Sequence, residues 1–372
     1  MKAKFSEVLT IINGRNQRAV ENPDGEYPIY GSGGIMGYAD EYLCEPETVI
    51  IGRKGNINKP IFVETPFWNV DTAFGLSADR EKLFPKYLYY FCEAYNFEKL
   101  NTTVTIPSLT KVNLLKVEMP LPDLEKQKNI SERLTLADDA VNTCNALLYE
   151  LDDLIKARFV EMFGDPVSNP KGWSMSLIEE VVSPEKNALK AGPFGSALKK
   201  EYYVESGYKI YGQEQVISGD PNYGDYYIDE ERYKQLENCA VQAGDVLISL
   251  VGTYGKLLIM PEHFEPGIIN PRLMKITFDK GKVNPYYFKH FFQSDSLKRS
   301  LADNTHGGTM DILNLGIVRK LAMPLPPIEL QNEFVDFIKQ VDKSKFAIKK
   351  IQDEAETLKE ALMQEYFGSC IA

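Results

Sequence analysis

One phrase of the sequence occurs twice, and each time a long segment without helix breakers follows it. MPLPDLEKQ (119–127) and MPLPPIELQ (323–331) stand 204 residues apart. The same offset holds downstream, where LIKARFVEMFG (154–164) matches LKEALMQEYFG (358–368). Self-similarity at a fixed offset is typical of a chain built from copies of one unit. The sequence therefore predicts an internal repeat of two copies.

The repeat continues upstream with shifted registers. Three matches run in the same order along both halves: YPIYG (27–31) with YKIYG (208–212), GRKG (52–55) with GTYG (252–255), and FPKYLYYF (84–91) with NPYYFKHF (284–291). The shifts place about 19 extra residues in one loop of the second half and about 4 in another, as expected for insertions in surface loops.

Each copy begins with a segment of mixed pattern. Residues 1–118 and 167–322 are rich in Tyr, Phe, Ile and Val, interrupted by Gly, Pro and Asn every several residues. ETVIIG and GDVLISLVG are typical of short buried strands, whereas PKYLYYFCEAY and PYYFKHFFQ are typical of short helices. These segments predict α+β globular heads with many loops.

Each copy ends in a segment of a different kind. Neither Gly nor Pro occurs from Asp123 to Phe163 or from Ile328 to Phe367, which predicts two helices of about 60 Å each. The apolar residues alternate steps of three and four, a coiled-coil signal. The expected seams are Ile130, Leu134, Ala137, Val141, Cys144, Leu148, Leu151 and Ile155, and then Phe334, Phe337, Val341, Ser344, Ile348, Ile351, Ala355, Leu358 and Leu362.

The expected fold is α+β, with two similar heads, two long antiparallel coiled-coil helices and a pseudo-twofold repeat. The alternative is that each helix belongs to the core of its own head. The prolines of the repeated phrase fix the entry direction of each helix and make the phrase a joint. The expected boundaries are head 1 at 1–120, helix 1 at 121–166, head 2 at 167–324 and helix 2 at 325–372.

The composition gives no sign of a metal site, a disulfide framework or a membrane segment. Five cysteines are scattered without a CxxC, and no His lies at metal spacing. No apolar run approaches the roughly 20 residues of a membrane-spanning helix, and the N-terminus lacks a signal-peptide pattern. We expect a cytoplasmic protein that binds no metal and no cofactor and makes no contact with membranes.

Catalytic motifs are incomplete. VGTYGKL and GSGGIMG lack the spacing of nucleotide-binding loops. NPYY (284–287) is similar to the Asn-Pro-Pro-Tyr of adenine methyltransferases, but it lacks the second Pro and a preceding glycine-rich loop, so a helix start is the better interpretation. PDLEK (122–126) has the letters of a nuclease site with the wrong spacing. We therefore expect no catalytic residue.

The doubled order of head, PLPxxEQ-like joint and helix resembles the DNA-specificity subunit of type I restriction-modification systems. YPIYGSGGIMGYADEYL (27–43) and AGPFGSALKKEYYVESGYKIYG (191–212) resemble stretches of that family's target recognition domains. The resemblance implies a subunit that is not an enzyme, in which each head reads half of a split double-stranded DNA target and the helices set the spacing. It implies two methyltransferase subunits that bind S-adenosylmethionine, and restriction or translocase subunits that use ATP and Mg²⁺.

The net charge of −11 runs against DNA binding, since DNA-binding proteins are usually basic. The two heads carry only −2 and −1 of that charge, and the helical segments carry −5 and −3. The heads are therefore nearly neutral, and contacts to phosphates must come from local clusters of Lys and Arg. We expect the chain alone to bind DNA poorly and to depend on its partners.

Reading bases in the major groove requires polar side chains on accessible loops, with Arg suited to G and Asn or Gln suited to A. The expected DNA-binding residues of head 1 are Arg15, Asn16, Arg18, Ser32, Arg53, Lys54, Asn56, Asn58 and Lys59. Those of head 2 are Lys199, Lys200, Gln213, Gln215, Thr253, Tyr254, Lys256, Arg272, Asn304 and His306.

Two other functions compete with a DNA-reading subunit. An autonomous DNA methyltransferase or nuclease would bind S-adenosylmethionine or divalent metals by itself. A protein-binding scaffold would leave DNA unprotected even with the methyltransferase present.

Overall fold

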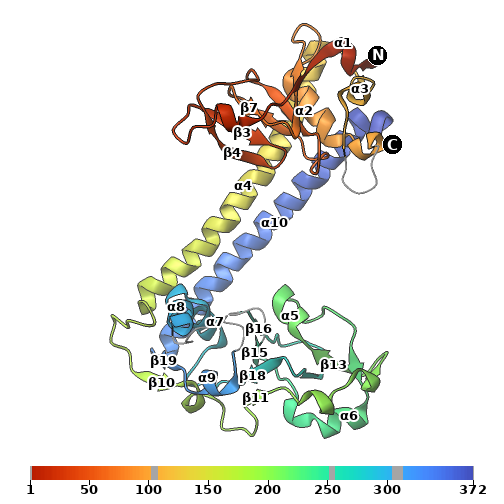
Figure 1. The fold of residues 1–372 in the computed structure, drawn as a ribbon. Coiled ribbons are helices and arrows are strands. Elements are labelled where there is room, and N and C mark those ends of the chain that lie inside the picture. Colours follow the sequence, from red (N-terminus) through yellow and green to blue (C-terminus); the bar gives the residue numbers. More distant parts are fainter. Residues whose placement is uncertain (1, 102–107, 251–255, 304–312, 372) are drawn as a thin grey trace. The chain divides into compact units, whose positions relative to one another are not determined.

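The computed structural model of the chain describes residues 2–101, 108–250, 256–303 and 313–371. The contacts divide the chain into two compact units. Unit 1 comprises Met1–Leu148 with Ala347–Ala372, and unit 2 comprises Tyr149–Phe346. Each unit holds one globular head and part of both long helices, so head 1 is built together with the far end of the chain (Figure 1).

Head 1 contains two sheets and a short strand pair. One sheet has the order β2-β8-β5-β6, the other has the order β4-β3-β7, and β1 pairs with β9. The strands are β1 (Lys2–Lys4), β2 (Leu9–Asn13), β3 (Tyr27–Gly31), β4 (Gly34–Ala39), β5 (Thr48–Gly52), β6 (Ile61–Val63), β7 (Trp68–Asn69), β8 (Ala73–Ala78) and β9 (Glu118–Pro120). The helices are α1 (Phe5–Val8), η1 (Gln17–Ala19), α2 (Pro85–Ala94), η2 (Phe97–Leu100) and α3 (Lys111–Leu114).

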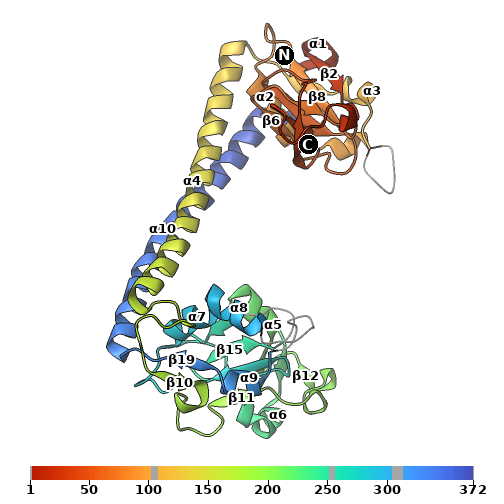
Figure 2. The same ribbon diagram turned by 60° about the vertical axis from the view of Figure 1, so that its left-hand side comes forward.

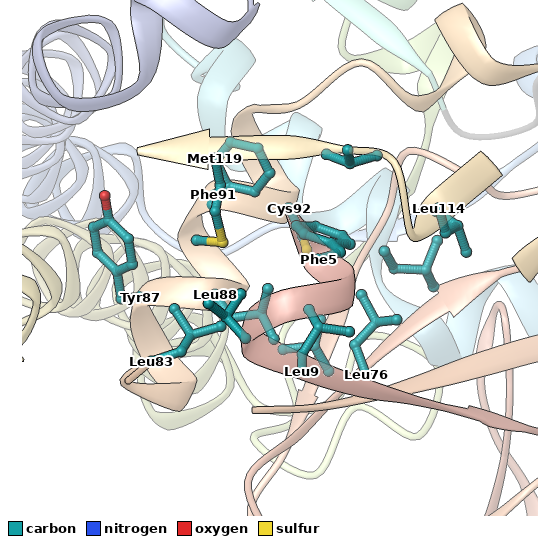
Figure 3. Close-up of a cluster of buried hydrophobic side chains, with 14 of the residues drawn as sticks. Phe5, Leu9, Leu76, Leu83, Tyr87, Leu88, Phe91, Cys92, Leu114 and Met119 are labelled. Atoms are coloured by element: carbon teal, nitrogen blue, oxygen red, sulfur yellow. The ribbon is translucent and has the colours of Figure 1, made fainter. Parts of the chain in front are cut away.

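The core of head 1 lies between α2 and the larger sheet. Every residue of β5 is buried, as expected for a continuous apolar strand at the centre of a sheet. In this core Leu88 of α2 lies near Leu9 of β2, and Phe91 packs with its ring centroid 5.8 Å from that of Phe5 (Figure 3). The far end of the chain completes it, because Phe367 is fully buried with its ring centroid 5.3 Å from that of Tyr87.

Head 2 repeats this plan (Figure 2). Its sheets have the orders β11-β18-β15-β16 and β12-β14-β13-β17, and β10 pairs with β19. The strands are β10 (Met175–Leu177), β11 (Leu189–Ala191), β12 (Tyr203–Val204), β13 (Tyr208–Tyr211), β14 (Tyr227–Ile228), β15 (Val246–Ser249), β16 (Leu257–Ile259), β17 (Gly267–Ile269), β18 (Leu273–Ile276) and β19 (Ala322–Pro324). The helices are η3 (Ile178–Glu180), η4 (Gly195–Ala197), η5 (Lys200–Tyr202), α5 (Gln213–Ser218), α6 (Glu230–Gln235), η6 (Glu237–Cys239), α7 (Pro285–Gln293), α8 (Asp295–Asp303) and α9 (Leu315–Arg319).

The core of head 2 takes in one long helix in the same way. Phe163, which lies 204 residues before Phe367, packs with its ring centroid 4.8 Å from that of Tyr287. NPYY begins a helix as predicted, since Asn284 caps α7 and Pro285 follows at its first turn. The sheets, the short strand pairs and these aromatic contacts confirm the internal repeat.

One of the matches between the two halves is wrong at its strand. Arg53 N donates to Thr72 O (2.8 Å), and Leu250 N donates to Arg272 O (2.9 Å). Thr72 and Arg272 are 200 residues apart, so Arg53 corresponds to Leu250 at an offset of 197. The match of GRKG (52–55) with GTYG (252–255) compared letters alone, and its second member lies outside the described residues, whereas the register of the strands before it follows backbone hydrogen bonds.

The two long helices are α4 (Leu124–Phe163) and α10 (Ile328–Ile371), which confirms the breaker-free runs as helices. Within each unit the two helices run antiparallel, because the partner's number falls as the residue number rises along α4. Two polar pairs show this order in each unit: Asp138 with Lys359 and Asn145 with Gln352 in unit 1, and Asp152 with Lys345 and Arg158 with Glu333 in unit 2.

The seam of α4 is confirmed at most of its positions. The predicted residues that are buried outright are Ile130, Leu134, Ala137, Cys144 and Ile155.

The seam of α10 was predicted wrongly at alternate positions. Ile351 and Leu358 are each 54% exposed. The inward positions lie one residue later, at Lys345, Gln352 and Lys359, where the repeat equivalents on α4 are apolar. Counting apolar residues selected the wrong alternation, because these three seam positions are polar and have polar partners on α4.

The repeated phrase forms a hydrogen-bonded joint between each head and its helix. Gln127 is fully buried; its Oε1 accepts from Phe84 N (2.8 Å), and its Nε2 donates to Lys82 O (2.9 Å) and Pro122 O (2.8 Å). A buried amide with every group paired fixes the direction in which the helix leaves the head.

The second joint is built in the same way. Gln331 is also fully buried; its Oε1 accepts from Asn284 N (2.9 Å), and its Nε2 donates to Lys282 O (2.9 Å) and Pro326 O (2.8 Å). The glutamine of the repeated phrase therefore has one structural role in both halves.

We expect Gln127→Leu and Gln331→Leu each to lower the free energy of unfolding by about 2–4 kcal/mol, because buried donors and acceptors lose their partners. Urea unfolding followed by circular dichroism measures the change. Gln340→Leu, at an exposed position of α10, is the matched control and should change stability by less than about 0.5 kcal/mol. Equal effects of all three substitutions would contradict the role of the joint.

His290 makes the stability of unit 2 depend on pH. Burial, followed by the charges of Lys289 and Lys345, lowers the pKa of His290 to about 4. The ring packs 5.2 Å from that of Phe334. An unfolded histidine binds a proton below about pH 6.5, whereas the folded one stays neutral until about pH 4. The contribution of neutral His290 to the stability of unit 2 is therefore fully present above about pH 6.5, the pKa of an unfolded histidine. It is lost as the pH is lowered from 6.5 to 4.

We expect a slope of about 1.4 kcal/mol per pH unit from this residue in that range. His290→Tyr, which installs the residue found at the repeat-equivalent Tyr90, should flatten the dependence. Thermal unfolding between pH 4 and 7 measures both proteins. An unchanged slope in the variant would show that other groups carry the pH dependence.

Candidate nucleic-acid interface

The predicted DNA-binding residues of head 1 gather where several strands end. Strands β2 and β5 both run antiparallel to β8, so they end at the same edge, and β3 runs parallel to β7. Arg15 N donates to Asn69 O (2.8 Å), and Arg53 N donates to Thr72 O (2.8 Å). Val70 N donates to Tyr30 O (3.0 Å) and extends the β3–β7 pairing, whereas the bond from Arg15 to Asn69 of β7 joins the two sheets at this edge. The loops that follow β2, β3, β5 and β7 therefore meet in one cluster, named edge 1.

Edge 1 presents accessible cations. Arg15, Arg53 and Lys59 are exposed, and none of them forms an ion pair within the part of head 1 that the structure describes. The Arg53 guanidinium lies 5.9 Å from the centroid of the Phe74 ring, which supports its stem. Unpaired guanidinium groups on rigid loops are suited to base edges and phosphates. The remaining predicted residues that are also exposed are Asn16, Arg18, Lys54, Asn56 and Asn58, and Ser32 is half-buried.

Two asparagines in this set have structural roles. The Asn16 side chain caps η1 by accepting from Arg18 N (2.9 Å). Asn58 Oδ1 accepts from Phe97 N (2.7 Å), and its amide donates to Asn96 (3.2 Å). Contact with bases was predicted for both side chains, and in the structure both form hydrogen bonds that hold loops of head 1.

Head 2 forms the equivalent cluster, edge 2, from the ends of β11, β13, β15 and β17. Asn270 N donates to Tyr211 O (2.8 Å), as Val70 does to Tyr30 in head 1. Gly192 N donates to Leu273 O (2.9 Å). Both heads therefore bring the same strand ends together, although the loops differ in sequence.

An exposed arginine is held in place at edge 2. Arg272 Nη1 donates to Gln213 Oε1 (3.2 Å), and Gln213 Nε2 donates to Ser249 Oγ (2.9 Å). Ser249 is 1% exposed and is thus a fixed point for this chain of hydrogen bonds. Asn270 lies in NPR (270–272), a stretch that the sequence indicated for base reading, whereas Ser249 was not predicted; the signal for Ser249 was available in the repeat, since it ends β15, whose counterpart β5 ends at edge 1.

The other predicted residues of head 2 have different placements. Lys199, Lys200 and Lys256 are exposed. Gln215 is only 2% exposed; its Oε1 accepts from Gly212 N (2.8 Å) and its Nε2 donates to Tyr223 O (2.5 Å). The expectation that Gln215 contacts bases does not fit this placement, because its amide is used inside the head. Thr253, Tyr254, Asn304 and His306 lie outside the described residues.

Neither head shows a catalytic constellation within the described residues. Those residues contain no group of three or more His, Cys, Asp and Glu side chains that could hold a metal ion. Burial raises the pKa of the Cys44 thiol to about 12, so it does not supply a thiolate near neutral pH. Asp245, whose pKa burial raises, is fully buried against Lys275 and Thr277, out of reach of a substrate.

The fold and the two edges define a protein with two similar heads, each presenting exposed Lys and Arg side chains suited to DNA. The chain belongs to the family of type I restriction modification DNA specificity domains, whose model matches residues 1–151 and 170–358. It therefore functions as the specificity component of such a system rather than as an enzyme.

Individual proteins agree with this assignment. The MjaVIII specificity subunit of Methanocaldococcus jannaschii is 22% identical over 74% of this chain and 68% of its own length. The EcoBI specificity subunit of Escherichia coli is 21% identical over 85% of this chain and 70% of its own length. The S subunit structure from M. genitalium matches 99% of this chain and 96% of its own with a TM-score of 0.61 at 16% identity, which confirms the fold.

Helices that could cross a membrane were sought in the described residues, and none is long and apolar enough.

Two glycines allow the loops of each edge to approach the neighbouring backbone. A Cβ added at Gly14 would lie 1.8 Å from Val70 O, and one at Gly192 would lie 1.9 Å from Asn270 O. We expect Gly14→Ala and Gly192→Ala each to lower stability by about 1–3 kcal/mol and to loosen the edge loops, because backbone must move. Urea unfolding and amide hydrogen exchange measure both effects.

Gly33→Ala and Gly195→Ala are the matched controls, since a Cβ at either position meets nothing within 4 Å. Unchanged hydrogen exchange in the Gly14 and Gly192 variants would show that the edges tolerate the displacement.

Proposed function

We propose that each head reads one half of a two-part double-stranded DNA target through its edge, and that the chain thereby directs its partners to that sequence. The observation that carries the proposal is the repeated edge. Equivalent strands end at the same edge in both heads, and both edges present exposed arginines and lysines. A shared scaffold with different loop residues is suited to reading two different half-sites.

The electrostatics favour binding with partners. With a total charge of −11, and heads of −2 and −1, the long-range attraction to phosphates is weak. Local cations at the two edges then position the heads on the DNA and contact bases, whereas further phosphate contacts come from other subunits. We therefore propose methyltransferase subunits as partners, and restriction or translocase subunits as additional ones. The chain itself binds neither S-adenosylmethionine nor ATP and Mg²⁺; these belong to the partners.

The helices of unit 1 present a surface for such partners. Leu147 of α4 and Ile351 of α10 each precede a seam residue, and in an antiparallel pair such positions lie on the same face. Their exposed fractions are 41% and 54%, and Leu136 (70%) and Leu358 (54%) extend the same stripe. Exposed apolar stripes of this kind mark protein interaction sites. Because its target is DNA, we place the protein in the cytoplasm.

A scaffold that binds only proteins is the alternative, and DNA binding distinguishes the two. We expect Arg15→Ala or Arg53→Ala to weaken recognition of one half-site, and Arg272→Ala to weaken recognition of the other, by roughly 1–3 kcal/mol each. Competition binding of the methyltransferase-bound protein to duplexes with either half-site altered measures this.

Arg80→Ala is the matched control, because Arg80 pairs with Glu47 (2.8 Å) away from edge 1. Equal losses on unrelated DNA would recast the arginines as phosphate contacts. DNA binding that no edge substitution affects would overturn the proposal.

A further inference from the structure

The most exposed large apolar side chain in the described part of the molecule lies at edge 2. Phe194 is 90% exposed, in a turn between the end of β11 and η4. An aromatic ring left almost wholly in water gains free energy when any apolar surface covers it. Single exposed apolar residues need no explanation, so the case for Phe194 depends on its mounting and its neighbours.

The turn that carries Phe194 is anchored on both sides. On one side, Gly192 N donates to Leu273 O (2.9 Å), and Pro193 is buried. On the other, Ala197 N donates to Phe194 O (2.8 Å), and Leu198 is buried in the core at 6% exposure. The ring is therefore held out from the surface by a fixed base and does not sit at the tip of a long loop.

The neighbours of Phe194 are cationic. Lys199 and Lys200 follow it in the chain and are exposed. Gly192 packs against the backbone of Asn270, two residues from the exposed Arg272. Lys199 also pairs with Glu201 (3.4 Å). Of these three cations, Lys200 and Arg272 have no acidic partner in the described part of the molecule. An exposed apolar ring on an edge with such cations is complementary to DNA, which offers stacked apolar base faces between two rows of phosphates.

Edge 1 has a counterpart built from other residues. Ile35 and Met36, near the start of β4, are 55% and 63% exposed. The Met36 sulfur lies over Gly31, beside Ser32 at the end of β3. A Cβ added at Gly52, which precedes Arg53, would lie 3.0 Å from Ser32 Cβ, so this loop approaches the strand end that carries an exposed cation. Head 1 thus also holds exposed apolar side chains at its edge, although no sequence motif links them to Phe194.

We propose that Phe194 of head 2, and Ile35 with Met36 of head 1, are apolar wedges that enter the DNA and partly unstack a base step within or beside each half-site. The proposal rests on the proposed function and adds to it a mechanism of DNA deformation. Phe, Ile and Met are the kinds of side chain that proteins insert between base steps. The cost of unstacking depends on the step, so the wedge adds selectivity at positions that no polar side chain contacts.

Unstacking also serves methylation. A base inside a duplex must leave the stack before an enzyme can modify it. A wedge on the specificity component would weaken the stack where the partner methyltransferase acts. The wedge is thus expected to affect methylation as well as binding.

The test uses the full-length chain assembled with its methyltransferase and duplexes that carry 2-aminopurine at successive positions of the half-site that Arg272 affects. Binding of the unsubstituted protein should raise the fluorescence at one position, as the probe loses its stacking. Phe194→Ala should abolish that rise and weaken binding about 10- to 100-fold, the range of one base–aromatic stacking contact. Phe194→Leu, which keeps an apolar wedge, should retain most of both signals.

Phe346→Ala is the matched control, since Phe346 is 74% exposed on α10. The wedge is overturned if Phe194→Ala keeps the fluorescence rise and binds within twofold of the unsubstituted protein. It is also overturned if Phe194→Ala prevents assembly with the methyltransferase, measured by size-exclusion chromatography, because Phe194 would then be covered by protein.

Failure of the wedge and failure of the proposed function are distinguishable. If Arg272→Ala weakens binding and Phe194→Ala does not, the wedge alone is wrong. If the assembled protein shows no sequence-dependent binding at all, both proposals are wrong.

Discussion

The two buried glutamines at the joints are the contacts on which the rest of the structure depends. A helix of about 60 Å amplifies any change in its starting direction, so the joint must be rigid for the helix pair to form. Gln127 and Gln331 achieve this with one amide each, which satisfies two backbone carbonyls and one backbone N–H of the head and its joint. Since a half-satisfied buried amide is costly, the head and the helix are stable only in this arrangement. The preceding prolines restrict the chain further, and the two features explain why the phrase is repeated.

Polar side chains in the helix pair impose a second constraint, on which helix pairs with which. Lys359 reaches both Glu93 and Asp138 at 2.7 Å, so one seam residue of α10 joins α4 and α2 of head 1. Polar residues at seam positions cost stability but specify the partner and the register. The equivalent position on α4 is Ile155, so the two helices are not interchangeable despite the repeat. The chain therefore combines a symmetric plan with an asymmetric seam.

The heads show the same combination of common scaffold and individual surface. Backbone hydrogen bonds at the strand ends are repeated, such as those of Val70 and Asn270, and these hold the edges in place. The side chains that project from the edges differ, with Arg53 at edge 1 and the Arg272–Gln213 pair at edge 2. Recognition residues can change without loss of stability when the scaffold is held by backbone contacts, since loops tolerate substitution.

The sequence by itself determined the repeat, the two long helices, the joints and the family, because each depends on local pattern: breaker-free runs, apolar spacing and a duplicated phrase. It also determined which loops carry cations. Tertiary structure alone decided which of those side chains are available. Gln215 and Asn58 have the composition of base-reading residues, but their amides bond inside the heads. The α10 seam was likewise decided by Lys345 and its acidic partner, since a polar pair across two helices leaves no apolar signal in either one. Hydrogen bonds to other loops of the same head, which no local pattern reveals, separate a structural amide such as that of Asn58 from one that is available to DNA.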